Sequence, residues 1–256
     1  MSDDRGSEML AGPAKKRRRG LGPLFFAALA VAVVLSGILA YDAVRNRNTQ
    51  LNSQSLRVSG IPASVTTSQA NLMSLSPVPH KMAPNFTLVD QNGKTMSLRS
   101  FRGRSVVLEF MDPHCVDICP IVSQEFVDAY HDLGTKASGV VFVAVNVNQY
   151  FHSVANMAKF TAEHQLNTIP SWHFFTGSVP TLKSIWHAYG IMVSAPKPTA
   201  DIVHTSIVLF IGPDGRERYL GAPSDQRNMQ GIAFLPAGQL TSWGKGIALV
   251  AQSMSN

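Results

Sequence analysis

From residue 84 onward, hydrophobic positions recur with the periods of strands and helices. Two largely apolar, β-branched runs, 105–110 and 140–147, are typical of strands buried in the middle of a sheet. Helix-like spacing of apolar residues follows each of these runs and returns at the end of the chain. We therefore predict strands over 85–90, 95–98, 105–110, 140–147, 171–175, 206–211 and 217–220, and helices over 120–134, 153–166, 179–189 and 236–253.

Turn signals join these elements into one fold. Asn92-Gly93 lies between the first two predicted strands, as in a tight β-hairpin, and the turn 212–215 separates the last two strands. Strands that alternate with helices and end in a hairpin favour an α/β domain with a mixed sheet. The predicted fold class is therefore α/β over residues 84–256.

Residues 42–83 show neither period. This stretch is rich in Asn, Gln, Ser, Thr and Val and contains Pro62, Pro77 and Pro79. A polar segment without periodicity that is interrupted by proline is typical of an extended linker. We predict a linker over 42–83 that separates the domain from the N-terminal segment.

The first 41 residues have the pattern of a membrane anchor. Residues 15–19 are five consecutive cations, and 21–41 contain no charged residue. A helix of that length spans about 30 Å, the thickness of the hydrocarbon core of a bilayer. Because cations stay on the cytoplasmic side, we predict a cytoplasmic tail over 1–20, a single transmembrane helix over 21–41 and a domain outside the cytoplasm. A cleaved secretory signal is the alternative, and it exports the domain as well.

The distribution of charge argues against a nucleic-acid function. The chain has a net charge of +6, yet residues 84–256 contain twelve acidic and twelve basic residues. The excess positive charge therefore lies in the N-terminal segments, and no basic face is indicated on the domain. Phosphate-binding glycine loops, nucleotide fingerprints and hydrolase motifs do not occur in the sequence. We predict neither a nucleic-acid nor a nucleotide ligand.

The chain contains two cysteines, Cys115 and Cys119, between a predicted buried strand and Pro120, a residue that suits the first turn of a helix. Their spacing places both sulfurs on one side of a helical turn, where the positive end of the helix dipole favours the thiolate. A disulfide across so short a loop stabilises a fold little, which favours a reactive pair. From these residues alone, three roles for the pair are compatible with the sequence: an inert disulfide, a redox-active pair and a soft-metal site.

Three segments of the sequence point to a known family. Residues 115–120 read Cys-Val-Asp-Ile-Cys-Pro, and residues 83–94 have the pattern of the start of a redoxin domain. His204 stands just before a strand that runs into Asp214-Gly215. Together these segments resemble the Sco/SenC family of copper chaperones over about 83–255. The sequence differs from the family pattern at Val116, where proline is usual, and over 146–152, where the family has a stretch rich in Asp and Pro.

The resemblance implies a thioredoxin-like fold that begins with a β-hairpin, and a copper carrier rather than an enzyme. It implies copper ligands Cys115, Cys119 and His204, and delivery to the dinuclear copper centre on the copper-bearing subunit of cytochrome c oxidase. Copper(I) is a soft ion that prefers thiolates and accepts two or three ligands, whereas structural zinc requires four. The expected cargo is copper as Cu(I), with Cu(II) as a second form.

Two other functions compete with the carrier. A thiol–disulfide oxidoreductase needs only Cys115 and Cys119 as catalytic residues, and it should tolerate His204→Ala. A membrane-bound copper or redox sensor is the third hypothesis, and the short cytoplasmic tail argues against it.

Three residues beside the cysteines have roles that the sequence leaves open. We interpret His114 as a solvated loop histidine, although it adjoins Cys115 and is an alternative copper ligand. Met111 follows a predicted core strand and is interpreted as a packing residue. Asp117 lies between the cysteines, where it either tunes a thiol pKa or hydrogen-bonds within the loop.

Overall fold

The computed structural model describes residues 37–43 and 59–255. The chain divides into two units, Met1–Ser55 and Leu56–Asn256. In the first unit, residues 37–43 form a helix with exposed side chains. No helix within the described ranges is long and apolar enough to cross a membrane. The predicted tail over 1–20 and all of the predicted anchor before residue 37 lie outside these ranges, so the anchor stays a prediction.

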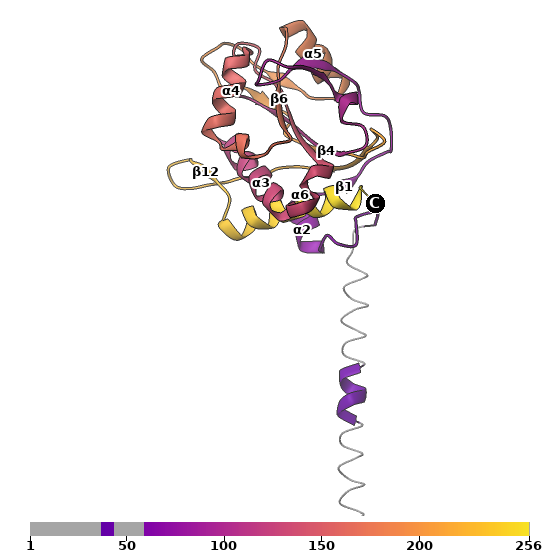
Figure 1. Ribbon diagram of the computed structural model, residues 1–256. Coiled ribbons are helices and arrows are strands. Elements are labelled where there is room, and N and C mark those ends of the chain that lie inside the picture. Colours follow the sequence, from indigo (N-terminus) through magenta and orange to yellow (C-terminus); the bar gives the residue numbers. More distant parts are fainter. Residues whose placement is uncertain (1–36, 44–58, 256) are drawn as a thin grey trace, which may run out of the picture. The chain divides into compact units, whose positions relative to one another are not determined.

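A six-stranded mixed sheet forms the centre of the second unit, with the order β1-β10-β9-β4-β5-β6 (Figure 1). Strands β4, β5 and β6 run parallel, while β9 is antiparallel to β4 and β10 is antiparallel to β9. All residues of β4, β5 and β9 are buried, because both faces of the sheet are covered. The strands are β1 (Ser76–Pro77), β4 (Ser105–Met111), β5 (Val140–Asn146), β6 (Trp172–Phe175), β9 (Val208–Ile211) and β10 (Glu217–Gly221).

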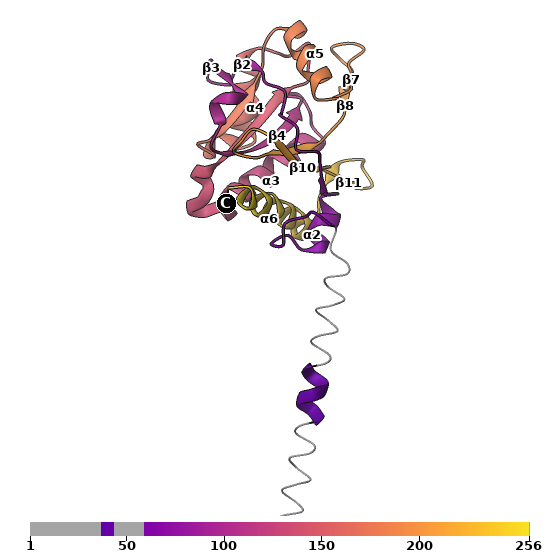
Figure 2. The same cartoon turned by 90° about the vertical axis from the view of Figure 1, so that its right-hand side faces the viewer.

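Helices and a hairpin cover the two faces of this sheet. Side chains such as Val107 and Phe210 pack against α3 and α6, and α2 and α4 lie on the same face. On the other face, Leu108 and its neighbours pack against α5 and the β2–β3 hairpin. The two views show these elements on the opposite side of the sheet from α3 and α6 (Figure 1, Figure 2). These elements are α2 (Thr67–Leu72), β2 (Thr87–Val89), β3 (Thr95–Ser97), α3 (Ile118–Leu133), α4 (Val154–Glu163), α5 (Val179–Ala188) and α6 (Ala237–Ser253).

Each strand and helix predicted after residue 84 is present, with ends that differ by a few residues. Pro120 lies in the first turn of α3, and Ser153 caps α4 by accepting the N–H of Asn156. Gly93 has a φ of +77° in the turn of the β2–β3 hairpin, where an L side chain would be strained. Short elements complete the domain: η1 (Leu98–Phe101), η2 (Gly134–Gly139), η3 (Leu166–Thr168), β7 (Val193–Ser194), β8 (Val203–His204), β11 (Gln226–Arg227) and β12 (Ala233–Phe234).

The structure differs from the predicted linker within residues 59–83, which are part of the folded domain. Thr66 and Gln69 form a capping box that starts α2, and β1 pairs with β10 at the edge of the sheet. Met73 is fully buried, and Val65 and Leu75 lie in the same core cluster. Helix α2 has six residues and strand β1 has two, too few to show a period in the sequence. The order of the segment therefore comes from apolar contacts with α6 and the sheet rather than from helix propensity.

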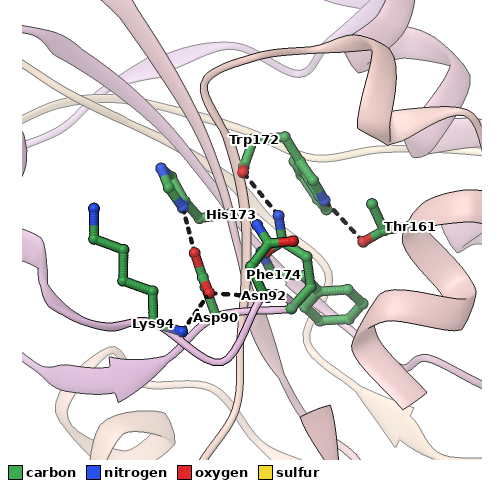
Figure 3. A network of polar contacts seen from close by, with 8 residues as sticks. Asp90, Asn92, Lys94, Thr161, Trp172, His173 and Phe174 are labelled. Carbon is green, nitrogen blue, oxygen red and sulfur yellow. Dashed lines mark hydrogen bonds and ion pairs between the residues drawn. The ribbon is translucent and has the colours of Figure 1, made fainter. Parts of the chain in front are cut away.

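The turn of the β2–β3 hairpin is hydrogen-bonded to the edge strand β6 (Figure 3). The side chain of Gln91 donates to the carbonyl of Trp172 at 3.1 Å and accepts the N–H of Phe174 at 2.7 Å. Asp90 Oδ2 lies 3.0 Å from His173 Nδ1 on the same strand. Gln91 thereby occupies two backbone groups that an edge strand otherwise exposes, which protects this edge of the sheet from pairing with another chain.

Candidate metal centre

The loop that contains the cysteines follows β4 directly and is fixed by a buried carboxylate. Asp112 Oδ1 accepts the N–H of His114 and the side-chain amide of Asn148, both at 2.8 Å. The carbonyl of Asp112 accepts the N–H of Cys115 at 3.1 Å. Because Asn148 lies just after β5, these bonds hold the cysteine loop against the neighbouring strand end. Neither Asp112 nor Asn148 was predicted as part of the site, although an acid directly after a buried strand is a signal for this position.

The two cysteines are free thiols with different surroundings. Cys115 is half-buried, whereas Cys119 is only 2% exposed. The Cys119 thiol hydrogen-bonds the Cys115 sulfur, and with the N–H groups of Cys119 and Asp117 it lowers the pKa of Cys115 to about 7, although burial opposes this. The same hydrogen bond, together with burial, raises the pKa of Cys119. Cys115 therefore ionises first, near neutral pH.

The helix start supports the Cys115 thiolate directly. The backbone N–H of Cys119 donates to Cys115 Sγ at 3.3 Å. This N–H belongs to the first turn of α3, where amide groups have no partner within the helix and carry the positive end of its dipole. The sequence predicts that the helix start favours a thiolate in the cysteine pair, and in the structure the cysteine that it contacts is Cys115.

His204 reaches the site from β8, which pairs with β7. Its Nδ1 lies 3.0 Å from the carbonyl oxygen of Thr205. Because a carbonyl oxygen only accepts, Nδ1 carries the proton of the neutral ring and Nε2 keeps a lone pair. Burial lowers the pKa of His204, which favours the neutral imidazole that binds metals.

Cys115 and His204 line one open cavity of about 590 Å³, together with Asp112 and Ser206. Cys119 does not line this cavity and is buried in the core cluster against which Cys115 packs. Across residues 37–43 and 59–255, no three His, Cys, Asp or Glu side chains are grouped closely enough to hold a metal ion. The structure thus brings two of the predicted ligands to one cavity and the third beside Cys115, and the three-ligand set stays a prediction.

The residues around the cysteines have defined contacts. His114 is exposed and stacks on Phe151 with a centroid separation of 3.7 Å, while its Nε2 lies 3.2 Å from Asn156 Nδ2. Met111 is fully buried in the core cluster, which agrees with a packing role. Both side chains therefore have contacts that require no metal.

Asp117 connects the cysteine loop to a hairpin that is distant in the sequence. Its Oδ2 accepts Arg227 Nη2 at 3.0 Å, and Arg227 Nη1 donates to the carbonyl of Gly231 at 3.0 Å. Arg227 lies on β11, which pairs with β12. The ion pair therefore fastens the β11–β12 hairpin beside the cavity, a role that the sequence did not reveal.

Two buried acids lie behind the site. Glu109 on β4 accepts Ser206 Oγ at 3.1 Å, and its second oxygen has no partner among the described residues. Neither carboxylate oxygen of Glu125 on α3 has a partner in that part of the chain. Burial raises the pKa of both carboxyls, which favours their neutral forms. Glu109 interrupts an otherwise apolar run, and this was the available signal in the sequence.

The sequence of the domain is similar to those of known proteins. The family model described as SCO1/SenC matches residues 76–231. The chain is 27% identical over 146 residues to the SCO1 protein homolog of Bacillus subtilis, covering 55% of this chain and 72% of the relative. It is 27% identical over 139 residues to the mitochondrial protein SCO2 homolog of Bos taurus, covering 51% and 50%. The chain thus spans about half the length of this mammalian relative.

A solved structure shares the fold. Bradyrhizobium japonicum ScoI, whose structure is described with copper bound, aligns with a TM-score of 0.52 and 20% identity, covering 68% of this chain and 99% of that chain. This likeness confirms the predicted mixed α/β, thioredoxin-like fold. Since the family model spans more than half of the sequence and includes the cysteine motif and His204, the chain belongs to the SCO1/SenC family.

Proposed function

We propose that this protein is a copper carrier that binds Cu(I) through Cys115, Cys119 and His204 and serves the assembly of cytochrome c oxidase. One observation carries this function: Cys115 and His204, from segments far apart in the sequence, line the same cavity, and the Cys119 N–H contacts the Cys115 sulfur. The relatives support it, since the fold matches a ScoI structure described with copper bound.

The donor set suits copper as a transported ion. Cys115 supplies a sulfur that ionises near neutral pH, and His204 offers Nε2 because its Nδ1 donates to a carbonyl. Soft sulfur and imidazole donors match Cu(I), and a cavity that is open to solvent lets a ligand of the recipient approach before these donors release the ion. Because ion binding displaces thiol protons, the affinity for copper should rise with pH.

The carrier would work outside the cytoplasm while attached to the cell membrane. The uncharged run 21–41 behind five cations supports a single-pass anchor with the N-terminus in the cytoplasm. The recipient would be the subunit that bears the dinuclear copper centre of cytochrome c oxidase. The full chain should stay with membranes after an alkaline wash, whereas residues 42–256 should be released, and release of the full chain would contradict the anchor.

Copper titration of the reduced full chain against a chromophoric Cu(I) chelator tests the carrier. The chain should bind one Cu(I), and Cys115→Ser, Cys119→Ser and His204→Ala should each weaken binding by at least about tenfold, the loss of about 1.4 kcal/mol. His187→Ala is the control, because this exposed histidine lies on α5, outside the cavity lining. Unchanged affinity in His204→Ala would remove this residue from the ligand set, and failure of the reduced chain to bind copper would overturn the function.

A thiol–disulfide oxidoreductase is the second candidate, and the unequal cysteines favour it. Cys115 has the lowered pKa of an attacking thiol, and buried Cys119 is placed to resolve a mixed disulfide. The two functions differ at His204. A reductase loses activity on a disulfide substrate when either cysteine is replaced and keeps it in His204→Ala, whereas a carrier loses copper transfer in all three variants.

A further inference from the structure

A second cavity lies at the opposite end of β4 from the cysteines. It has a volume of about 110 Å³ and is bounded by the start of β4, the η1 segment and the turn that joins β9 to β10. Its apolar floor includes Leu98, Val106 and Ile211. No cysteine or histidine lines it, so this cavity is separate from the proposed copper site.

Three arginines line this cavity: Arg99, Arg102 and Arg104. Within residues 37–43 and 59–255, none of their guanidinium groups has an ion pair or a hydrogen bond to a carboxylate, although the domain has equal numbers of acids and bases over 84–256. The acid beside the rim is Asp214, and its Oδ2 is already 2.7 Å from Arg218 Nη2. The cavity therefore concentrates positive charge that no acid of the described chain neutralises.

Neighbouring groups hold these donors in place. The Arg102 side chain lies against Gly215, where an added Cβ would be 2.7 Å from Nε. The Arg104 guanidinium lies over the Phe101 ring, 5.6 Å from its centroid. Such contacts reduce the conformational entropy that a ligand would otherwise have to remove on binding.

Asn85 adds a fourth donor to the cavity wall. Its Oδ1 accepts Ser97 Oγ at 2.8 Å and the N–H of Arg99 at 3.2 Å. The acceptor atom of the amide is therefore used, and the Asn85 Nδ2 group has no partner in the described part of the chain. The polar side chains of this cavity thus offer only donors, and a ligand that satisfies them must supply several acceptors.

We propose that this cavity binds a phosphate group, either of a free phosphate or phosphate ester or of a lipid headgroup. Guanidinium groups match phosphate oxygens in bidentate geometry, and four donors without an acceptor fit a multivalent oxyanion better than a carboxylate. The cavity is smaller than the engineered cavity of about 150 Å³ that holds benzene, so it accommodates one phosphate but no nucleoside. Exposed Arg99 and Arg102 at its rim leave space for a substituent to extend into solvent.

The test compares two charge-matched double variants of the full chain. Arg99→Gln with Arg102→Gln removes two cations of the cavity, and Lys136→Gln with Lys183→Gln removes two exposed cations that lie outside its lining. The cations of residues 15–19 are common to all variants, so differences between them report the cavity. Calorimetric titrations of the full chain in detergent micelles, with inorganic phosphate and with phosphatidic acid or phosphatidylcholine added to the micelles, separate the two sources of phosphate, since the predicted anchor is then the same in every measurement.

The Arg99→Gln, Arg102→Gln double variant should bind the probe that the wild-type chain binds at least about tenfold more weakly than the Lys136→Gln, Lys183→Gln double variant does. This is the effect expected when charge-assisted hydrogen bonds are lost. Arg102→Lys, which keeps the charge but loses the bidentate fork, should also weaken binding. Binding of inorganic phosphate alone assigns a free phosphate, and a preference for phosphatidic acid over phosphatidylcholine in the micelles assigns a headgroup. Equal loss in both double variants, or no binding of either probe by wild type, overturns the proposal. Circular dichroism confirms that the exposed substitutions leave the fold intact.

Discussion

At the scale of single residues, the two cysteines have identical side chains, and their thiol pKa values differ because their surroundings differ. Cys115 receives the N–H of Cys119 at 3.3 Å and faces a cavity, whereas Cys119 is buried against the core. Hydrogen bonds to the charged form lower a thiol pKa, and burial raises it. The motif spacing alone indicates a reactive pair, and the surroundings decide which sulfur reacts first.

Alkylation of the reduced full chain should therefore be selective and dependent on pH. The rate of Cys115 modification by iodoacetamide should rise with pH and reach half of its maximum near pH 7, where its thiol ionises. Cys119 should stay unmodified over the same time, because it is buried and its pKa is raised. Mass spectrometry of peptides reads both sites.

Cys119→Ala provides the control for this interpretation. It removes the thiol that hydrogen-bonds Cys115 and should move the midpoint for Cys115 to higher pH. Faster modification of Cys119 than of Cys115 in the wild-type chain would contradict the assignment.

At the scale of elements, helices α3 and α6 pack closely against each other at Gly244. A Cβ at Gly244 would lie 2.6 Å from Asp128 Cβ and 3.1 Å from the carbonyl oxygen of Glu125. The two helices approach so closely that only a hydrogen fits between them at this point. Since α3 begins at the cysteine motif, this contact also fixes the helix that presents the site.

Gly244→Ala should lower the free energy of unfolding by about 1–3 kcal/mol, since the added methyl group must push α3 and α6 apart. Gly238→Ala in the same helix is the matched control, because a Cβ there meets nothing within 4 Å. It should leave stability unchanged or raise it by up to about 1 kcal/mol, because alanine favours helix over glycine. Urea denaturation monitored by circular dichroism measures both, and equal effects would show that the helices are not in close contact.

At the scale of the whole molecule, buried acids make the stability of the domain depend on pH. Burial raises the pKa of Glu109 and of Glu125 above the ordinary value of 4.5. The folded state therefore binds these protons more tightly than the unfolded state. Their contribution is fully favourable below the unfolded pKa and is lost as the pH rises toward the folded pKa values.

Glu125→Gln should flatten this dependence, since the neutral amide has no proton to lose. Relative to wild type, the variant should gain at least about 1 kcal/mol in unfolding free energy between about pH 5 and about pH 8. Asp132→Asn, an exposed change on the same helix, should leave the dependence as it is in wild type. Urea denaturation at the two pH values provides the comparison, and parallel curves for all three proteins would contradict the role of Glu125.

The sequence by itself determined the elements from residue 84 onward, the cysteine motif and the family. Strand and helix periods are local properties, so the buried run over 105–110 and the helix from Pro120 were predictable without the fold. The same holds for the hairpin around Gly93, because a turn selects its residues from the local backbone conformation.

Only the tertiary structure decided which residues act together. The segment over 59–83 lacks a period, and it folds because Met73 is buried in the core cluster of the domain. The meeting of Cys115 with His204 in one cavity, and the donors that Arg102 and its neighbours present at the other end of β4, depend on contacts between distant segments. Burial and hydrogen bonding are set by all the elements that surround a side chain, and no short stretch of sequence contains that information.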